Sequence, residues 1–235
     1  MSNSKNKESI ELEKVMAAKE AVTHIRDHHI VGLGSGTTVY YAIREVGELV
    51  QKGMQLKAIS TSKKTQELAE SFSIPTIDSN SVDHIDVTID GADEINEDYV
   101  LIKGGGGALL REKIVASMTR KQIIIADSSK QVIQLGKAFK LPVEVIPFAT
   151  KHVENQLKQL GGKPIIRTLS GENFLTDEGN WILDVDFGHI LDPRTLSDSL
   201  NGIVGLVCHG LFIDLADLVI IGSDRITKTE IVSSS

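Results

Sequence analysis

The amino-acid sequence predicts an α/β fold in which a Rossmann-like domain with a mostly parallel sheet carries an inserted ferredoxin-like α+β domain, a candidate lid. Up to about residue 135, short apolar runs typical of buried strands alternate with segments of helical periodicity, the order that builds a parallel sheet. From Leu141 the order becomes strand, helix, strand, strand, helix, strand, which is the split βαβ unit. A last apolar run, residues 217–222, returns to the first type. We therefore expect an α/β domain of residues 1–135 plus 214–235 and an inserted domain of residues 136–213.

The first helix is expected from about Ser9 to Asp27, after a tail of residues 1–8. Its apolar residues recur at the three- and four-residue spacing of one helix face. Lys14 lies beside this stripe, where a lysine commonly packs its carbon chain on the apolar surface and keeps its charge in water. The stripe consists of Leu12, Val15, Met16, Val22 and Ile25.

A strand, a turn rich in glycine and hydroxyl groups, and an amphipathic helix follow over residues 28–50. The first amides of a helix have no internal partner and its dipole favours an anion, so this arrangement suits a phosphate group. Turns of this kind also occur in βα units that bind no ligand. The P-loop and dinucleotide-binding patterns are absent, so neither ATP nor NAD is expected. The candidate phosphate ligands are Ser35, Gly36, Thr37 and Thr38.

The next predicted elements are a strand over residues 57–60, a helix over residues 62–72 and an extended segment over residues 74–77. Ser62 is a plausible cap for this helix, because a serine side chain accepts a hydrogen bond from the first turn. A further strand begins at Ile85, alternates apolar residues to Ile89 and is broken by Gly91.

Two aspartates follow that strand directly. Asp90 and Asp93 are expected at its carboxyl end, where open α/β sheets bind ligands. The DGAD sequence is also typical of a hydrogen-bonded turn with a purely structural role. Both interpretations stay open for the aspartates alone.

Four glycines and a glutamate come next. A short strand over residues 99–102 ends at Lys103 and runs into Gly104–Gly107, which allow a ligand to approach the main chain. A helix is expected to start near Ala108 and to contain Glu112. The positions three and four residues from Glu112 hold Ala108, Leu109, Val115 and Ala116, so no residue of opposite charge is available on the helix itself. This placement favours a chemical role over that of a solvated surface glutamate.

The remaining elements are predicted from apolar runs and helical spacing. The run 122–127 is a buried strand, and Lys130 lies just beyond its end, where it is either a surface charge or a ligand-binding residue. The later strands are expected at 141–147, 163–168, 181–186, 205–213 and 217–222, and the later helices at 150–160 and 193–201.

Composition excludes several classes of function. The net charge is −7 and no basic patch with interleaved aromatic residues occurs, so a nucleic-acid partner is not expected. No apolar run approaches the roughly 18 residues of a membrane span, and the polar N-terminal stretch lacks the apolar core of a signal peptide. The single cysteine, Cys208, fits a reducing cytoplasm and lies in an apolar run typical of a buried, inert thiol. The His28–His29 pair has no further ligand at metal spacing, so no metal site is predicted.

Six segments of the chain resemble ribose-5-phosphate isomerase of the A type, in the same order and with similar spacing over roughly residues 10–222. Ser35 stands where the family usually has threonine, a change that keeps the hydroxyl, and the last residues match poorly. The segments are GSGTT (34–38), DGADEIN (90–96), IKGGGGALLREK (102–113), ADSSKQV (126–132), LPVEVIP (141–147) and LGGKPIIR (160–167).

The resemblance implies an aldose–ketose isomerase that interconverts ribose 5-phosphate and ribulose 5-phosphate through a cis-enediolate, in the non-oxidative pentose phosphate pathway. It assigns Glu112 as the base and places Lys103 near the reacting oxygens. Asp90 and Asp93 would bind hydroxyls, help to open the sugar ring and shuttle the proton between oxygens. It also implies a catalytic α/β domain, no cofactor, no metal, a cytoplasmic location and a homo-oligomer, either dimer or tetramer. The implied substrate-binding residues are Lys14, Ser35, Gly36, Thr37, Thr38, Gly91, Ala92, Gly104, Gly105, Gly106 and Lys130.

Two other functions fit the same residues less well. An acyl-CoA transferase of similar fold would use a glutamate as nucleophile, yet the sequence shows no surface suited to CoA. A sugar-sensing regulator would need a DNA-binding element, and only about eight residues precede the first predicted helix.

Overall fold

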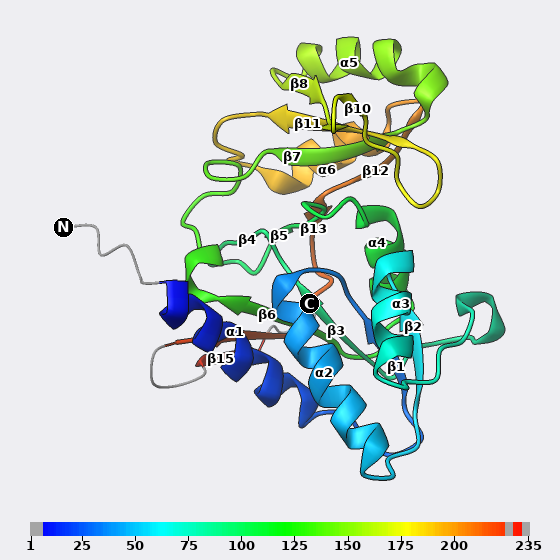
Figure 1. The fold of residues 1–235 in the computed structure, drawn as a ribbon. Coiled ribbons are helices and arrows are strands. Elements are labelled where there is room, and N and C mark those ends of the chain that lie inside the picture. The colour runs from blue at the N-terminus through cyan, green and yellow to red at the C-terminus, as the bar shows by residue number, and fades with distance from the viewer. Residues whose placement is uncertain (1–6, 224–227, 232–235) are drawn as a thin grey trace. The chain divides into compact units, whose positions relative to one another are not determined.

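The computed structural model describes residues 7–223 and the backbone of residues 228–231. The chain folds into two compact units (Figure 1). The first unit comprises residues up to 92, residues 111–130 and residues from 214 onward; the second comprises residues 93–110 and 131–213.

The first unit is built on a six-stranded sheet in the order β15–β14–β6–β3–β1–β2. All neighbouring strands are parallel except β15, which pairs antiparallel with β14, so the predicted mostly parallel sheet is confirmed. The strand β15 lies in the C-terminal segment for which the sequence gives no prediction. The strands are β1 (Ile30–Leu33), β2 (Lys57–Ser60), β3 (Val87–Gly91), β6 (Gln122–Asp127), β14 (Leu218–Gly222) and β15 (Lys228–Ile231).

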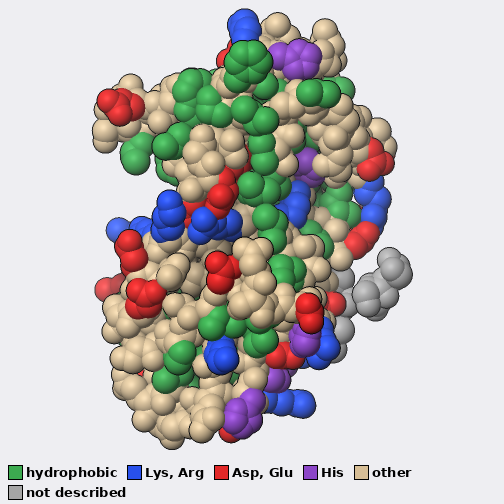
Figure 2. Space-filling model, turned by 90° about the vertical axis from the view of Figure 1, so that its right-hand side faces the viewer, with side chains coloured by type: hydrophobic (Ala, Val, Ile, Leu, Met, Phe, Trp, Pro, Cys, Tyr) green, Lys and Arg blue, Asp and Glu red, His purple; other side chains and the backbone are tan. Residues whose placement is uncertain are grey.

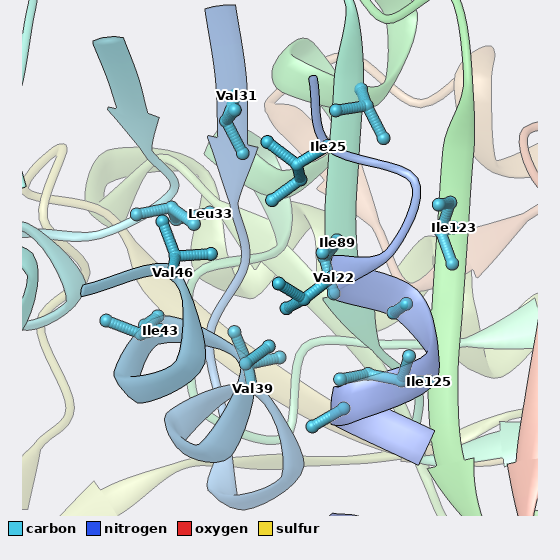
Figure 3. Close-up of a cluster of buried hydrophobic side chains, with 14 of the residues drawn as sticks. Val22, Ile25, Val31, Leu33, Val39, Ile43, Val46, Ile89, Ile123 and Ile125 are labelled. Atoms are coloured by element: carbon cyan, nitrogen blue, oxygen red, sulfur yellow. The ribbon is translucent and has the colours of Figure 1, made fainter. Parts of the chain in front are cut away.

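Helices α1 (Lys7–Val22) and α2 (Thr37–Gln51) lie side by side in Figure 1 and pack on each other and on the sheet. Figure 3 shows the apolar side chains that meet between these helices and the strands, among them Val39 and Ile43 of α2 and Ile123 of β6. Helices α3 (Lys63–Ser71) and α4 (Leu109–Ser117) complete the set, with short 3₁₀ turns η1 (Ser79–Ser81) and η2 (Ser128–Lys130). Ser62 caps α3 as predicted, its hydroxyl accepting from the Thr65 N–H at 3.0 Å.

The prediction for the first helix was wrong in its length, and its apolar stripe is buried only in part: Val22 and Ile25 are buried, and Ile25 lies beyond the end of the helix. Helix α1 begins at Lys7, inside the predicted tail, whose residues 1–6 lie outside the described part of the chain. It ends at Val22, because the following amides turn back to carbonyls three residues earlier. Leu12 is 51% exposed, whereas Ala17, Ala18 and Ala21 are fully buried. Small alanines allow α1 to approach its neighbours closely, and together with Val22 they form the apolar part of its buried face.

The second unit contains a four-stranded antiparallel sheet in the order β12–β7–β11–β8. Together with its two helices this is the predicted ferredoxin-like unit, and its buried valines and leucines form a core of their own. The elements are β7 (Leu141–Val145), the 3₁₀ turn η3 (Pro147–Ala149), α5 (Thr150–Gln159), β8 (Lys163–Ile166), β11 (Trp181–Asp186), α6 (Pro193–Asn201) and β12 (Leu206–His209).

The strand predicted over residues 205–213 is broken in the structure. At Gly210 the chain leaves the four-stranded sheet, because the Gly210 N–H donates to the Pro142 carbonyl and its own carbonyl accepts from the Lys103 N–H. The remainder, β13 (Leu211–Phe212), pairs with β5 (Leu101–Ile102), which in turn pairs with β4 (Glu94–Ile95). The strand β4 and the short hairpin of β9 (Thr168–Leu169) and β10 (Glu172–Asn173) were not predicted.

Residues 93–110 differ from the predicted domain division. The sequence assigns this segment to the α/β domain, whereas in the structure it packs with residues 131–213. The antiparallel pairing of β5 with β13 accounts for the difference, since a periodicity pattern does not identify the partner of a two-residue strand. In the described part of the chain, no helix has the length and apolar character needed to cross a membrane.

Candidate functional site

The turn between β1 and α2, for which the sequence predicts phosphate binding, ends in an open helix start. Helix α2 begins at Thr37, and Gly36 and Thr37 are exposed, so the first amides of the helix face an accessible region. Gly34 is needed for close packing, because a Cβ atom there would lie 2.0 Å from the Asp90 Oδ1 atom. Thr38, by contrast, is buried. The turn therefore combines an open helix start with a tight contact to the end of β3.

The Ser35 hydroxyl belongs to a network of hydroxyl groups. Its Oγ atom lies 2.9 Å from Thr61 Oγ1, 3.0 Å from Ser62 Oγ and 3.0 Å from Thr65 Oγ1. Thr65 in turn donates to the Gly34 carbonyl at 3.0 Å. This network holds the turn after β1 against the start of α3. Its members from residues 61–65 were not assigned to the site from sequence, although serine and threonine at a strand–helix junction are a usable signal.

Asp90 links the end of β3 to the same turn. Its side chain is fully buried, and Oδ1 accepts from the Gly91 N–H at 2.7 Å and from the Ser35 N–H at 3.2 Å. These bonds match the hydrogen-bonded turn that the sequence allowed. They also fix a carboxylate beside the phosphate-binding candidates, so the two interpretations are compatible.

Lys14 is held on α1 by an acidic partner. Its Nζ atom donates to Glu11 Oε1 at 2.8 Å, and the Tyr41 hydroxyl donates to Glu11 Oε2 at 2.5 Å. The bond from Lys14, followed by that from Tyr41, lowers the pKa of the Glu11 carboxyl. The same bond to Glu11 raises the pKa of Tyr41. The side chain of Lys14 is only 12% exposed, which differs from a lysine with its charge in water.

Glu13, which no sequence motif singles out, joins α1 to the turn after β6. It is fully buried, and its Oε2 atom accepts from the Ser128 N–H at 2.9 Å and from Ser128 Oγ at 2.8 Å. Lys130 closes this turn and is partly buried. Asp127 also serves the turn by accepting from the Ser129 N–H at 3.0 Å.

Glu112 lies in the first turn of α4 and is 4% exposed. A surface glutamate in water is therefore excluded. Buried carboxylates are uncommon and are typical of groups with a specific polar environment. Its helix neighbours Val115 and Ala116 are buried as well.

The second unit supplies a buried lysine and the segment Gly104–Gly107, which we call the glycine loop. Lys103 is 2% exposed, its Nζ atom lies 5.4 Å from the centre of the Phe212 ring, and its backbone N–H donates to the Gly210 carbonyl. A cation over an aromatic face is stabilised by the ring quadrupole. The lysine is thus fixed at both its backbone and its side chain.

Asp93 holds the glycine loop. Its Oδ2 atom accepts from the Gly105 N–H at 2.8 Å, and its own N–H donates to the Ile102 carbonyl at 2.8 Å. A Cβ atom at Gly105 would lie 2.7 Å from Asp93 Oδ1, so this approach requires glycine. Gly105 and Gly106 are exposed, which leaves their backbone accessible to a ligand.

Two further polar anchors in the second unit were missed from sequence. The buried Glu94 accepts from three backbone donors, the amides of Gly136, Ala138 and Phe139 at 2.6–2.8 Å. The second anchor is Arg167, which contacts the glycine loop. Both lie inside segments that carry the family resemblance, but a single sequence does not show what they contact.

Each unit therefore brings part of the predicted set together. In the first unit, Asp90 joins the turn of Ser35 and Gly91, whereas Lys14 bonds to Glu11. In the second, Asp93 joins Gly105, and Lys103 precedes the loop.

Among the described residues, no group of three or more His, Cys, Asp or Glu side chains is placed to hold a metal ion. Local groups set the field at any one site more than the net charge does, and Figure 2 shows both acidic and basic side chains on the face that it draws.

Comparison with known proteins identifies close relatives. Residues 57–225 match the family described as ribose 5-phosphate isomerase A (phosphoriboisomerase A). The chain is 47% identical over 209 residues to Ribose-5-phosphate isomerase A of Sphingopyxis alaskensis, covering 89% of this chain and 91% of that protein. It is 48% identical over 213 residues to the protein of the same name from Thermomicrobium roseum, covering 90% of each.

A solved structure agrees with these sequence matches. It is described as D-ribose-5-phosphate isomerase in complex with phospho-erythronic acid and is 37% identical to this chain. The two superpose with a TM-score of 0.90, covering 93% of this chain and 97% of the other.

Proposed function

The chain belongs to the ribose 5-phosphate isomerase A family, and from this premise we propose that it interconverts D-ribose 5-phosphate and D-ribulose 5-phosphate. The observation that carries the proposal is the match along 93% of the chain to an isomerase solved with phospho-erythronic acid. A phosphorylated acid of this kind has a planar carboxylate, which resembles the planar enediolate expected during isomerisation. The reaction belongs to the non-oxidative pentose phosphate pathway.

Glu112 is proposed as the base that moves the carbon-bound proton. Its carboxylate removes the proton from C2 of the open-chain aldose. The electrons of that C–H bond form the C1–C2 double bond of a cis-enediolate, and the electrons of the C1 carbonyl double bond move onto O1. The same carboxyl group then returns the proton to C1, while the C2 oxygen loses its proton and becomes the ketone. Burial of Glu112 supports this role, since buried carboxylates are uncommon and are typical of groups with a chemical function.

The charge that develops on the enediolate oxygen needs a donor. Lys103 is the proposed donor, supported by its burial and by its position directly before the glycine loop. Asp90 and Asp93 are proposed to bind hydroxyls, assist ring opening and shuttle the proton between O1 and O2. Their hydrogen bonds to backbone amides fix where each carboxylate lies.

The phosphate group is proposed to bind at the start of α2. The amides of Gly36 and Thr37 and the Thr38 hydroxyl are the candidate donors, with Lys14 and Lys130 supplying positive charge. Because the Ser35 hydroxyl bonds to residues 61–65, we infer that Ser35 chiefly shapes the turn. Contacts of the substrate with Gly91, Ala92, Gly104, Gly105 and Gly106 remain part of the proposal.

We further propose that the protein acts in the cytoplasm and as a homo-oligomer, a dimer or tetramer. The single, buried Cys208 supports a reducing compartment, because the chain has no second cysteine for an internal disulfide. Size-exclusion chromatography with light scattering would give the mass in solution. A monomer at every concentration tested would contradict the oligomer.

The direct test is to incubate the purified chain with ribose 5-phosphate, with and without a metal chelator, and to measure ribulose 5-phosphate. Equal conversion in both samples is expected, and the Glu112→Gln protein is the control for contaminating isomerase. A lack of conversion by the native chain would contradict the proposed function. Conversion that stops only when chelator is present would contradict a reaction without a metal.

A further inference from the structure

Arg167 makes contacts with the backbone of the glycine loop that the proposed mechanism does not use. Its Nη1 atom donates to the Gly104 carbonyl at 2.9 Å and to the Gly105 carbonyl at 3.1 Å. Its Nε atom donates to Asp184 at 2.9 Å and Nη2 donates to the other carboxylate oxygen at 2.5 Å. The planar guanidinium thus joins a carboxylate on β11 to two successive carbonyls of the loop.

Hydrogen bonds also fix the backbone of Arg167. The Arg167 N–H donates to the Ile182 carbonyl on β11, and the Arg167 carbonyl accepts from the Phe174 N–H, at distances of 2.8 and 2.9 Å. The guanidinium also lies 5.7 Å from the centre of the Phe174 ring. That ring packs on the same loop, since a Cβ atom at Gly107 would lie 2.5 Å from it. Arg167 and Phe174 therefore support the loop from one side.

These contacts determine the direction of the loop amides. The described chain contains no cis peptide bond, and the carbonyl and N–H of a trans peptide point in opposite directions. The peptide between Gly104 and Gly105 is held at both ends, its carbonyl by Arg167 and its N–H by Asp93. In the next peptide the Gly105 carbonyl points to Arg167, so the Gly106 N–H points away from it. Gly106 is exposed, and apart from its chain neighbours no atom lies within 4 Å of its Cβ position, so its backbone is accessible to a ligand.

We propose that Arg167, oriented by Asp184, is a positioning residue that fixes the glycine loop so that the Gly106 N–H is directed at the substrate oxygen that gains negative charge. This inference rests on the proposed function. It explains why an arginine, and not a lysine, occupies the position: a single ammonium group does not reach two carbonyls and two carboxylate oxygens in one plane. Preorganised backbone donors of this kind act on the transition state more than on the bound substrate.

The test compares Arg167→Lys, Arg167→Ala and the native protein. Lys151→Ala is the matched control, because it removes a cation paired with Glu154 in the same unit, away from the loop. Arg167→Lys should lower kcat about 10–100-fold, less than the roughly 10²–10³-fold cost of removing an oxyanion donor outright, because the donor is displaced and not lost. KM should change by less than about threefold. Adding methylguanidinium should restore part of the kcat of Arg167→Ala, whereas a merely damaged fold would not respond.

Hydrogen–deuterium exchange gives a readout that needs no substrate. In Arg167→Lys, amides of residues 104–107 should exchange faster, while those of β7 and β11 keep the native rate. Native exchange in the loop together with native kcat would overturn the inference. So would a loss of kcat accompanied by faster exchange throughout the second unit and no rescue. If the native chain failed to isomerise ribose 5-phosphate, the proposed function would fail, and the exchange experiment would still decide whether Arg167 holds the loop.

Discussion

Burial of charge is shared by three of the four side chains to which we assign catalytic roles, the exception being the half-buried Asp93. Asp90, Lys103 and Glu112 are at most 4% exposed, although charged residues are rarely buried to this extent in globular proteins. Removing such groups from water strengthens their electrostatic interactions with a reacting molecule. The free energy of their desolvation lowers the stability of the folded protein. At this scale, the most informative experiments change one atom or one charge while keeping the shape of the side chain.

Glu112→Gln preserves the size of the side chain but removes its ability to accept the C2 proton. We expect kcat to fall by about 10²–10⁴ or more, with KM and melting temperature little changed. Exchange of the substrate's C2 hydrogen with deuterated water should be lost in the same variant, as measured by NMR. Exchange at the native rate would show that Glu112 is not the base, and Asp90 or Asp93 would become the candidate.

Lys103→Ala tests whether the lysine stabilises the enediolate more than the bound sugar. A group that acts mainly in the transition state affects kcat, so kcat should fall about 10²-fold or more while KM rises less than kcat falls. Steady-state kinetics at several concentrations of ribose 5-phosphate separate the two. If kcat stayed native and KM rose strongly, Lys103 would instead contribute to binding the ground state.

At the scale of elements, the candidate residues gather where strands end and helices begin. Asp90 lies at the end of β3, the turns after β1 and β6 hold Ser35 and Lys130, and the start of α2 offers its first amides. The carboxylates of Asp90, Glu13 and Asp127 accept hydrogen bonds from backbone amides of these turns, so acidic side chains fix the backbone around the site. In the second unit Asp93 and Arg167 do the same for the glycine loop.

Thr38→Val removes the hydroxyl at the start of α2 while keeping the shape of a buried side chain. Loss of a hydrogen bond to a charged group is worth roughly 1.5–3 kcal/mol, which corresponds to a decrease in kcat/KM of about 10–100-fold. The loss should appear with ribose 5-phosphate and be absent with unphosphorylated ribose, if that sugar turns over measurably. Equal losses for both sugars would mean that the turn has only a structural role.

Glu144 on β7 gives a prediction about stability and pH. Burial raises the pKa of its carboxyl and outweighs the opposing hydrogen bonds from Asn180 and Thr176. The folded state therefore holds this proton more tightly than the unfolded state, so stability falls as pH rises from the ordinary carboxyl pKa through the raised one. Glu144→Gln keeps an acceptor oxygen for both donors but does not titrate. Its melting temperature relative to the native protein should be higher at pH 7 than at pH 4; an equal difference at both would contradict the assignment.

At the scale of the molecule, strands defined by apolar runs were predictable and contacts between distant segments were not. Residues 57–60, 122–127 and 181–186 form strands with the predicted bounds, because uninterrupted or alternating apolar residues specify a buried strand locally. The break at Gly210 and the pairing of β5 with β13 depend on a partner about 110 positions away, which periodicity does not reveal.

For the candidate site, too, contacts between segments distant in sequence were not predictable. Asp90, Lys103 and Glu112 were singled out because their residue types lie beside glycines and strand ends, and the structure finds all three buried. Glu13 and Arg167 escaped notice because each acts through the backbone of a segment far away in the sequence. The three candidate residues thus lie in a local pattern, whereas Glu13 and Arg167 were not identifiable from their own sequence neighbours.

The place of β6 in the sheet has a consequence for synthesis on the ribosome. All six residues of β6 are buried, yet its neighbour β14 joins it only after about 90 further residues, and the Gln122 N–H bonds to an Asp217 carboxylate 95 positions later. Until β14 has been synthesised, β6 has an unpaired apolar edge in the nascent chain, and such an edge promotes aggregation. Chains stalled before residue 210 should be cleaved by protease near β6 and bind chaperones, and chains long enough to release residue 222 should not. Equal protease resistance at both lengths would show that the edge is covered by other means.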